Sequence, residues 1–340
     1  MKAVVYNNPR DFEVKEIEKP TIAPNQVLLK VKASGICRTD VHIHEGEFIS
    51  RFPLTPGHEF AGEIVEVGAD VTEFKVGDRV AADNTVLCGW CYYCRRNQPL
   101  YCENFYSLGC NGPGGFAEYV KVNHDKVFHI SDNLSYDVAS FTEPTACAIH
   151  GMDRIDLRCG DDVLIFGAGP TGIILTQLIK LGGAANVVVV ASNQMKLDLI
   201  EKNGYAHTIL MDRNDYSKHT KELNQRFPKG FDVIVEATGS PRVLEHCFDF
   251  GRKGAKIIVY GVIGEKERIS VSPNQIFSNE YNVIGSFAQT HCYDRALKYL
   301  ENGLVKVDDL ITDTYDLESF PEALDKMMNG KDSIKIIMQP

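Results

Sequence analysis

Four cysteines in one short stretch have the spacing of a metal-binding loop. The segment "CGWCYYCRRNQPLYC" contains Cys88, Cys91, Cys94 and Cys102. Four thiolates can enclose a tetrahedral Zn²⁺, and such a closed shell leaves no position for a substrate, so we predict a structural zinc. A redox-active Cys-x-x-Cys pair would leave two of these cysteines unexplained, and a zinc ribbon that binds nucleic acid conflicts with the net charge of −10.

A second set of candidate zinc ligands comes from three separate segments. "GICRTDVH" contains Cys37, "PGHEFAGEIVEVG" contains His58 and Glu59, and "FTEPTACAIHG" contains Glu143. No histidine follows Glu59 at the spacing of the helical metalloprotease motif, so that class is excluded. One cysteine, one histidine and one glutamate would leave the fourth zinc position open to water or substrate, which is what a catalytic zinc needs.

A glycine-rich turn indicates a dinucleotide site. "FGAGPTG" follows the short apolar run "DVLIFG" and precedes a helix-like segment. In such a frame Gly167 permits the tight turn, Gly169 lets a pyrophosphate approach the backbone, and Gly172 allows the helix to pack closely on the strand. The helix that begins near Pro170 and Thr171 offers its N-terminal N–H groups and positive dipole end to the phosphates.

The end of the next predicted strand bears on the choice of cofactor. An acidic residue there would bind the adenosine ribose of NAD, but "VVVVASNQMK" has Ala191, Ser192 and Asn193 instead. The small residue leaves room for a 2′-phosphate, with Ser192, Asn193 and Lys196 as possible partners, and the missing carboxylate removes a charge repulsion. No arginine stands in this stretch, so the phosphate site would be a mild one. We favour NADP(H) over NAD(H); a relaxed site that accepts both is the alternative.

The elements that must position these residues follow two patterns. The first ~150 residues alternate apolar and polar side chains between glycine and proline turns, as in 26–33 and 60–68, which predicts a β-rich region. From Asp161 onward short apolar runs alternate with helix-like segments, which is typical of βαβ units and a parallel sheet. After Phe287 the chain returns to helices and a last strand, "IKIIMQP", and we expect this tail to rejoin the first domain.

Composition places the chain among ordinary globular proteins. It has 340 residues, enough for two domains, with 44% hydrophobic and 24% charged residues. No apolar run reaches the ~20 residues that span a bilayer, and the start lacks the features of a secretory signal. We therefore expect a cytoplasmic protein with reduced thiols and a small-molecule substrate, and neither a nucleic acid nor a membrane as partner.

Taken together, these motifs resemble the zinc-dependent medium-chain dehydrogenases, in particular their polyol (sorbitol-type) branch. "GHEFAGEIVEVGADV" is similar to that family's zinc signature, and the four-cysteine loop, "GAGPTG" and the late "GSF" follow in the family's order. The resemblance implies an α/β protein with a discontinuous GroES-like β-rich catalytic domain, residues 1–148 and 288–340, that holds both zinc sites. A Rossmann domain with a doubly wound parallel sheet, residues 149–287, would be inserted, with the active site in the cleft between the two.

The resemblance also assigns roles around the catalytic zinc. Cys37 and His58 match zinc ligands of the family, and Glu143 stands where alcohol dehydrogenases usually have a second cysteine. Glu59 is the other carboxylate able to reach the metal, so which of the two glutamates binds it directly stays open. Asp40 fits the role of a residue that orients a ligand imidazole.

The segment "CRTDVH" is similar to the family's proton relay. Thr39 would hydrogen-bond the substrate oxygen and His42 would pass the proton to solvent, so Thr39, His42 and Glu59 are the predicted catalytic residues. Arg38 matches a position that meets the cofactor pyrophosphate in some members. The implied reaction is hydride transfer between the nicotinamide and a secondary hydroxyl of a polyol, or the corresponding ketose.

Departures from the sorbitol dehydrogenases affect the predicted substrate. Ala288 and Gln289 follow Phe287 where that group has an Arg-Tyr pair, and Ile43 replaces a tyrosine after the relay histidine. A pentitol such as arabitol or xylitol, another hexitol and a phosphorylated polyol all stay open. Other readings are a simple secondary-alcohol or aldehyde reductase and a cofactor-binding protein without catalysis. From the resemblance we further expect a homo-oligomer, a tetramer or a dimer.

Overall fold

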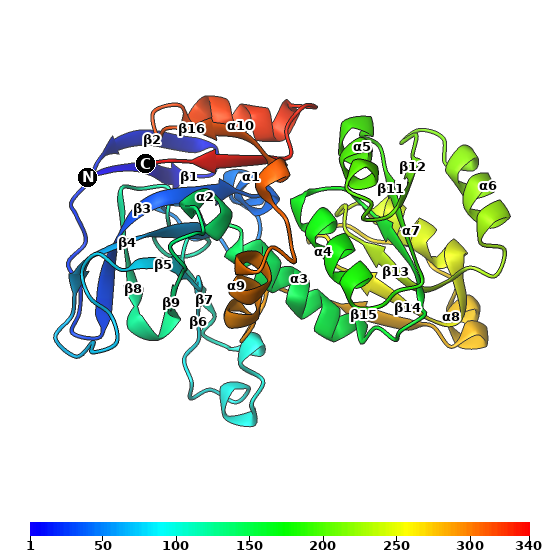
Figure 1. Cartoon of the computed structure of the whole chain (residues 1–340), viewed down its shortest axis with the longest axis horizontal. Coiled ribbons are helices and arrows are strands. Elements are labelled where there is room, and N and C mark those ends of the chain that lie inside the picture. Colours follow the sequence, from blue (N-terminus) through cyan, green and yellow to red (C-terminus); the bar gives the residue numbers. More distant parts are fainter. The chain divides into compact units, whose positions relative to one another are not determined.

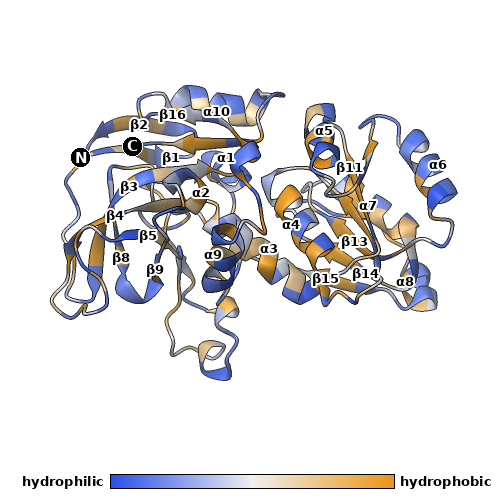
Figure 2. Ribbon diagram, in the orientation of Figure 1, coloured by the Kyte–Doolittle hydropathy of each residue, from blue (hydrophilic) through white to orange (hydrophobic).

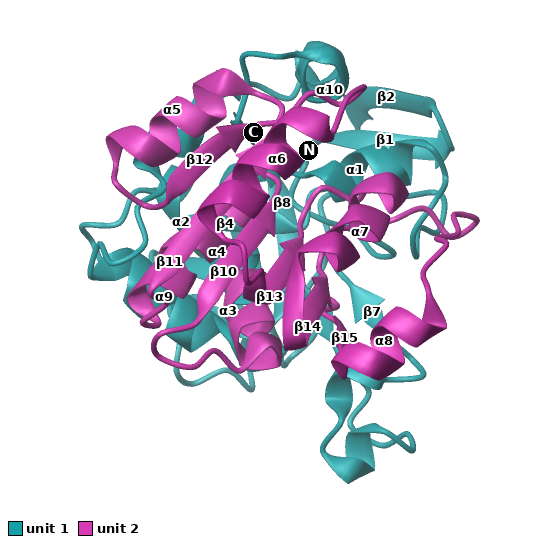
Figure 3. Ribbon diagram, turned by 90° about the vertical axis from the view of Figure 1, so that its right-hand side faces the viewer, with its two compact units in different colours: residues 1–146, 289–340 teal, residues 147–288 magenta.

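The computed structural model describes every residue from Met1 to Pro340 and divides into two compact units. Unit 1 comprises Met1–Ala146 and Gln289–Pro340, and unit 2 comprises Cys147–Ala288 (Figure 3). Unit 2 therefore interrupts the sequence of unit 1. The boundaries expected from the sequence, after residues 148 and 287, lie within two residues of these limits.

Unit 2 is built on a six-stranded sheet in the order β12-β11-β10-β13-β14-β15, and every neighbouring pair is parallel (Figure 1). Numbered by chain position, this order is 3-2-1-4-5-6, the doubly wound order of the Rossmann fold. The strands are β10 (Asp162–Phe166), β11 (Asn186–Ala191), β12 (His207–Leu210), β13 (Phe231–Glu236), β14 (Gly251–Val259) and β15 (Asn282–Gly285).

The central strands of unit 2 are apolar because helices cover both faces of a parallel sheet. The side chains from Val163 to Phe166 are fully buried, and Figure 2 shows the apolar colouring concentrated on strands such as β11 and β13. The helices are α4 (Pro170–Leu181), α5 (Gln194–Lys202), α6 (Ser217–Arg226), α7 (Pro241–Cys247) and α8 (Pro273–Asn279).

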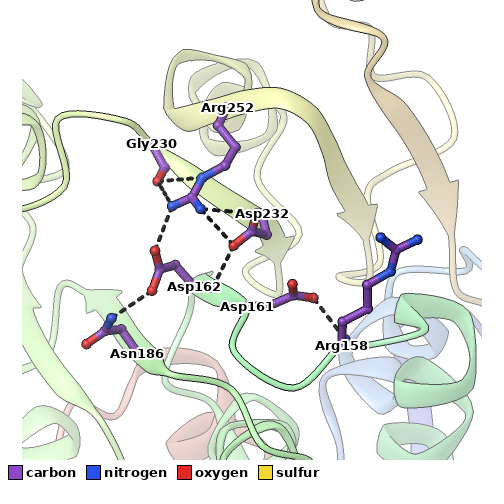
Figure 4. A network of polar contacts seen from close by, with 7 residues as sticks. All are labelled: Arg158, Asp161, Asp162, Asn186, Gly230, Asp232 and Arg252. Atoms are coloured by element: carbon purple, nitrogen blue, oxygen red, sulfur yellow. Dashed lines mark hydrogen bonds and ion pairs between the residues drawn. The ribbon is translucent and has the colours of Figure 1, made fainter.

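A polar network closes the amino-terminal edge of this sheet (Figure 4). The Arg252 guanidinium donates to Asp162 Oδ2 at 2.6 Å, to Asp232 Oδ1 at 3.2 Å and to the Gly230 carbonyl at 2.5 Å. Asn186 Nδ2 donates to Asp162 Oδ1 at 2.7 Å. The network joins the starts of β10, β11, β13 and β14, so the opposite, carboxyl-terminal edge is the one left for a ligand.

Unit 1 contains a seven-stranded sheet in the order β16-β17-β3-β4-β5-β9, with β8 paired to β3. The C-terminal strand β17 lies between β16 and β3, so the end of the chain is part of this sheet. The strands are β3 (Gln26–Ile36), β4 (Glu59–Val67), β5 (Arg79–Ala82), β8 (Tyr119–Asn123), β9 (Val127–His129), β16 (Ile311–Tyr315) and β17 (Lys335–Met338).

Short elements complete unit 1. The pairs β1 (Lys2–Asn8) with β2 (Asp11–Glu16) and β6 (Thr85–Val86) with β7 (Tyr106–Ser107) form two small antiparallel sheets. Its helices are α1 (Arg38–His44), α2 (Tyr136–Ala139), α9 (Tyr293–Glu301) and α10 (Phe320–Asn329), and the unit boundary falls within α3 (Thr142–Ile155). None of the helices has both the length and the apolar character needed to cross a bilayer.

Candidate active site and metal centres

Cys37 lies at the junction between strand β3 and helix α1. It is the N-cap of the helix, and the Asp40 carboxylate accepts a hydrogen bond from the Cys37 backbone N–H at 2.8 Å. A carboxylate at this position of the first turn satisfies an N–H group that the helix itself cannot pair. The sequence therefore fixes the start of the helix locally, and with it the position of the Cys37 thiol at the end of β3.

The ligand atoms of Cys37, His58 and Glu59 lie within 4.8 Å of one another. The pairing of β3 with β4 explains this, because Glu59 lies opposite Gly35, two residues before Cys37. His58 and Glu59 are both buried. Glu143, the second residue of α3, is also buried but does not belong to this group. Of the two glutamates that the sequence left open, Glu59 is thus the one gathered with the cysteine and the histidine.

His58 and Asp40 are arranged as a metal ligand and its orienting carboxylate. His58 Nδ1 is 3.6 Å from Asp40 Oδ1, and neither buried atom has a hydrogen-bond partner. Burial opposes a positive charge on the imidazole, but the neighbouring Cys110 thiol and Asp40 carboxylate outweigh it and raise the pKa of His58 well above its usual value. These anionic surroundings, with a thiol, an imidazole and a carboxylate converging, fit a bound zinc ion.

A buried lysine is part of this site, and the sequence analysis missed it. Lys335, the first residue of β17, is 2% exposed, and its Nζ forms an ion pair with Glu59 Oε2. Burial lowers the pKa of Lys335, but the Glu59 carboxylate and the Cys37 thiol outweigh burial, so this pKa is raised. Glu59 Oε2 is thus paired with a buried cation, and the same carboxylate belongs to the group formed with Cys37 and His58. A lysine within the apolar run "IKIIMQP" was the only signal in the sequence.

The predicted relay residues lie on helix α1. The Cys37 thiol is 3.7 Å from Thr39 Oγ1, which places that hydroxyl beside the metal-binding group. His42 lies three residues after Thr39, so both project from one side of the helix. His42 Nδ1 is 2.8 Å from Glu47 Oε2, and its side chain is 20% exposed. Arg38, predicted to meet the pyrophosphate, is the exposed first residue of α1.

The four cysteines of the loop also converge, as their spacing predicted. Their sulfur atoms lie within 4.8 Å of one another, with 4.0 Å between Cys88 and Cys94 and between Cys91 and Cys102. Burial raises the pKa of Cys88, but hydrogen bonds from the Trp90 backbone, the Asn104 side chain and the Cys91 backbone outweigh it and lower this pKa to about 6. A thiolate is the form that binds metal, so this arrangement fits a four-thiolate zinc site.

The glycine-rich turn of unit 2 has the shape expected for a pyrophosphate cradle. Gly167 has φ +119°, and a Cβ there would lie 2.7 Å from the Ala237 carbonyl oxygen. A Cβ at Gly172 would lie 2.5 Å from the Gly167 carbonyl oxygen, so helix α4 could not pack as it does. A Cβ at Gly169 would meet nothing within 4 Å, which leaves open space beside the helix N-terminus at Pro170 and Thr171. Of the three glycines, only Gly169 therefore borders open space that a ligand could occupy.

An arginine lies beside Ser192 at the carboxyl edge of the same sheet. Asn193 caps helix α5, its Oδ1 accepting from the Lys196 backbone N–H at 3.2 Å. The sequence stretch holds no arginine, but the next connection supplies one, since Arg213 Nε donates to Ser192 Oγ at 2.9 Å. The sequence pattern did not indicate this arginine, because it follows β12, the neighbouring strand, and not β11.

Comparison with known proteins agrees with this architecture. Residues 23–132 match the family described as "Alcohol dehydrogenase GroES-like domain", and residues 170–302 match "Zinc-binding dehydrogenase". D-arabinitol dehydrogenase 1 of Uromyces fabae is 45% identical over 341 residues, covering 100% of this chain and 97% of the relative. The chain belongs to the zinc-dependent medium-chain dehydrogenases, in their polyol branch. A sorbitol dehydrogenase of Bacillus subtilis (strain 168) is 33% identical over 346 residues, covering 100% of this chain and 97% of the relative.

A solved structure supports the same assignment. A Sinorhizobium meliloti 1021 protein, described as a zinc-binding dehydrogenase bound to NADP, superposes with a TM-score of 0.93 at 30% identity, covering 100% of this chain and 99% of that one. The prediction of a GroES-like domain with a Rossmann domain is confirmed. This medium-chain dehydrogenase is an NAD(P)-dependent alcohol or polyol dehydrogenase that uses zinc.

Proposed function

We propose that the protein is an NADP(H)-preferring polyol dehydrogenase that interconverts a pentitol and its ketose. The convergence of Cys37, His58 and Glu59 within 4.8 Å, beside the Thr39 hydroxyl, is the observation that carries the proposal. The three side chains would hold the catalytic zinc. When bound, zinc supplies a Lewis acid for the substrate oxygen, and the nicotinamide supplies the hydride acceptor.

The residues around Cys37, His58 and Glu59 orient these ligands and carry the proton of the reaction. Asp40 Oδ1 lies 3.6 Å from His58 Nδ1, where a closer contact would orient the ring and direct Nε2 at the metal. During oxidation the Thr39 hydroxyl would accept the substrate hydroxyl proton as it gives up its own, and His42, partly exposed and held by Glu47, would release that proton to solvent. Lys335 holds the Glu59 carboxylate in place through their buried ion pair, beside the other two candidate ligands. A second, structural zinc would occupy the four-cysteine loop.

The substrate proposal rests on the relatives' names and on where this chain departs from sorbitol dehydrogenases. The Uromyces fabae relative, which acts on D-arabinitol by its name, is more similar than the sorbitol dehydrogenase of Bacillus subtilis. Gln289, at a tyrosine position of sorbitol dehydrogenases, is buried and donates to Asp83 Oδ1 at 2.7 Å. Ile43 is fully buried against Leu54 and Cys110. Both side chains are buried and neither supplies the exposed tyrosine hydroxyl of the sorbitol dehydrogenases, so with the similarity to the Uromyces fabae relative we favour D-arabinitol over sorbitol.

Absorbance of the reduced nicotinamide tests the proposal directly. Purified protein would be offered D-arabinitol, xylitol, sorbitol, polyol phosphates and simple secondary alcohols, each with NADP⁺ and with NAD⁺. We expect D-arabinitol with NADP⁺ to give the highest kcat/KM. A preference for phosphorylated polyols or simple alcohols would overturn the substrate proposal, and a preference for NAD⁺ would overturn the cofactor proposal. Cys37→Ser is the matched inactive control, with Cys159→Ser, an exposed cysteine, as the active one.

Two further proposals concern the oligomeric state of the enzyme and its location in the cell. We propose a homo-oligomer, because β15 forms an open edge of the Rossmann sheet and exposes Val283, with the 82% exposed Phe277 on the nearby helix α8. Light scattering at several concentrations measures this, and a monomer throughout would refute it. We also propose a cytoplasmic location, since a four-thiolate metal loop requires reduced cysteines.

A further inference from the structure

The connection after β12 brings a guanidinium to the end of β11. Arg213 Nε donates to Ser192 Oγ at 2.9 Å, although the two residues belong to different βα connections. Strands β11 and β12 are parallel neighbours with Ala191 opposite Leu210, and the Met211 N–H extends the pairing by donating to the Ala191 carbonyl at 2.9 Å. Residues after Ala191 and after Met211 therefore emerge side by side at the carboxyl edge of the sheet, where dinucleotides bind.

A second arginine holds Arg213 in place. Arg242 Nη1 donates to the Arg213 carbonyl oxygen at 2.9 Å, and the Arg242 guanidinium lies 4.4 Å from the centroid of the Tyr216 ring. The loop itself is shaped by local turns, in which Asp212 accepts from the Asn214 N–H. The backbone that carries Arg213 is thus anchored on both sides, and the hydrogen bond to Ser192 directs its exposed side chain toward the end of β11.

The Arg213 guanidinium is not paired with a carboxylate, since Asp212 and Asp215 of the same loop accept hydrogen bonds from backbone N–H groups. Neither Arg213 nor Arg242 forms an ion pair with a carboxylate, and the Asp212 Oδ1 atom faces a backbone N–H group. The residues at the end of β11, from Ala191 to Asn193, contribute no acidic side chain. An exposed arginine that hydrogen-bonds a serine hydroxyl, next to a small residue and without an acidic partner, is suited to an anion with several acceptor oxygens.

We propose that Arg213 is the residue by which this enzyme recognises the 2′-phosphate of NADP(H), together with the Ser192 hydroxyl, and that Arg242 is a positioning residue for it. The inference rests on the NADP(H) preference proposed above and names the residue that produces it. A serine hydroxyl accepts from Arg213 and still donates to a phosphate oxygen. The guanidinium keeps its two terminal nitrogens for a bidentate contact, which the ribose 2′-hydroxyl of NAD(H) could not provide.

Calorimetric binding of two cofactor fragments isolates this contact from catalysis. Adenosine 2′,5′-bisphosphate carries the 2′-phosphate and 5′-AMP lacks it, and both would be titrated into the zinc-loaded, full-length protein. Arg213→Ala should weaken the bisphosphate by about 10- to 100-fold, the range for a hydrogen bond to a charged group, and change 5′-AMP affinity less than threefold. Arg213→Lys should recover part of the lost affinity, because lysine keeps the positive charge but lacks the two terminal nitrogens of the guanidinium.

A matched control and a second variant sharpen the result. Arg158→Ala removes an exposed arginine of the same unit at the other edge of the sheet, whose side chain contacts none of the network in Figure 4, and should leave the affinity ratio of the two fragments unchanged. Arg242→Ala should lower that ratio less than Arg213→Ala does, and the double variant should lose little beyond Arg213→Ala alone, because Arg242 acts through Arg213.

The outcomes separate the inference from the proposed function. If the wild-type protein prefers the bisphosphate and Arg213→Ala abolishes the preference, the inference holds. If the preference survives in Arg213→Ala, the inference fails while the proposed NADP(H) preference stands. A wild-type protein that binds both fragments equally overturns the preference and the inference together, and leaves the polyol chemistry untouched. Because Arg213 is exposed, its replacement should not change Tm, which verifies that the variants are folded.

Discussion

Lys335 and Glu59 form a buried ion pair although 276 residues separate them in the chain. Strand β17 pairs with β3, and β3 pairs with β4, so the starts of β17 and β4 meet at the end of β3. Gly35 leaves the space between them, since a Cβ there would lie 2.2 Å from Glu59 Oε2 and 2.6 Å from Lys335 Cε. The Glu59 carboxylate thus contacts the Lys335 ammonium group and lies within 4.8 Å of the ligand atoms of Cys37 and His58.

Removing the lysine should destabilise the metal-free protein more than the zinc-loaded one. Lys335→Met leaves Glu59 buried without its partner, which costs about 3–5 kcal/mol for a buried pair, whereas bound zinc still compensates the carboxylate. The free energy of unfolding, measured in urea with zinc and after chelation, checks this. Lys256→Met, which breaks a more exposed ion pair in unit 2, is the control. Equal losses in both metal states would contradict the idea that Glu59 faces the metal.

Replacing Glu59 and replacing Glu143, the two glutamates that the sequence left open as ligands, should weaken zinc binding to different extents. Glu59→Gln removes a member of the Cys37–His58 group, so its loss should exceed the ~10- to 100-fold that removal of an outer partner gives. Glu143 lies outside that group, so the loss of zinc affinity in Glu143→Gln should stay within this smaller range. Competition with a chromogenic chelator, together with metal analysis, measures both. Tighter zinc binding by Glu59→Gln than by Glu143→Gln would reverse the assignment.

The fluorescence of Trp90 can report on metal binding by the four-cysteine loop. Trp90 is the single tryptophan of the chain, it is 61% exposed, and it lies between Cys88 and Cys91. Cys94→Ser should lower the zinc content from about two ions to about one per chain and shift the Trp90 emission, while the zinc bound by Cys37 and His58 remains. Cys110→Ser does not serve as the control because Cys110 lies beside His58, but Cys159→Ser does. Unchanged emission and zinc content in Cys94→Ser would refute the structural zinc.

His219 should make unit 2 sensitive to acid. The side chain is 1% exposed, its Nδ1 has no hydrogen-bond partner, and its Nε2 is 3.0 Å from His246 Nε2. Burial, and then the neighbouring His246, lower the pKa of His219 from 6.5 to about 4. Between these values the unfolded chain binds more protons than the folded one, so this part of the stability is present above pH 6.5 and is lost as the pH falls toward about 4.

The contribution of His219 to acid sensitivity is tested by urea unfolding at pH 7.5 and at pH 4.5. The loss of stability between the two pH values should be smaller in His219→Gln than in the wild type, and unchanged in His207→Gln, where the histidine is exposed. All three proteins share the zinc ligands, so any loss of metal in acid affects them alike. The same pH dependence in His219→Gln and in the wild type would show that His219 does not titrate in this window.

Local patterns in the sequence predicted a large part of this protein. The four-cysteine loop and the turn from Gly167 to Gly172 each lie within one short segment, where spacing along the backbone already limits how far apart the side chains can be. The alternation of apolar runs and helix-like segments after Asp161 predicted the parallel sheet, because strands buried on both faces must be apolar throughout. The family resemblance added the pairing of Cys37 with His58.

Only the tertiary structure brought Lys335 to Glu59, placed Glu59 and not Glu143 with Cys37 and His58, and set Arg213 against Ser192. Each of these contacts depends on which strands are neighbours and in what register. A shift of one residue in β17 would turn Lys335 to the opposite side, and a shift in β12 would carry the loop with Arg213 away from Ser192. Strand order and register are set by the packing of the whole core, so no spacing within one segment encodes them.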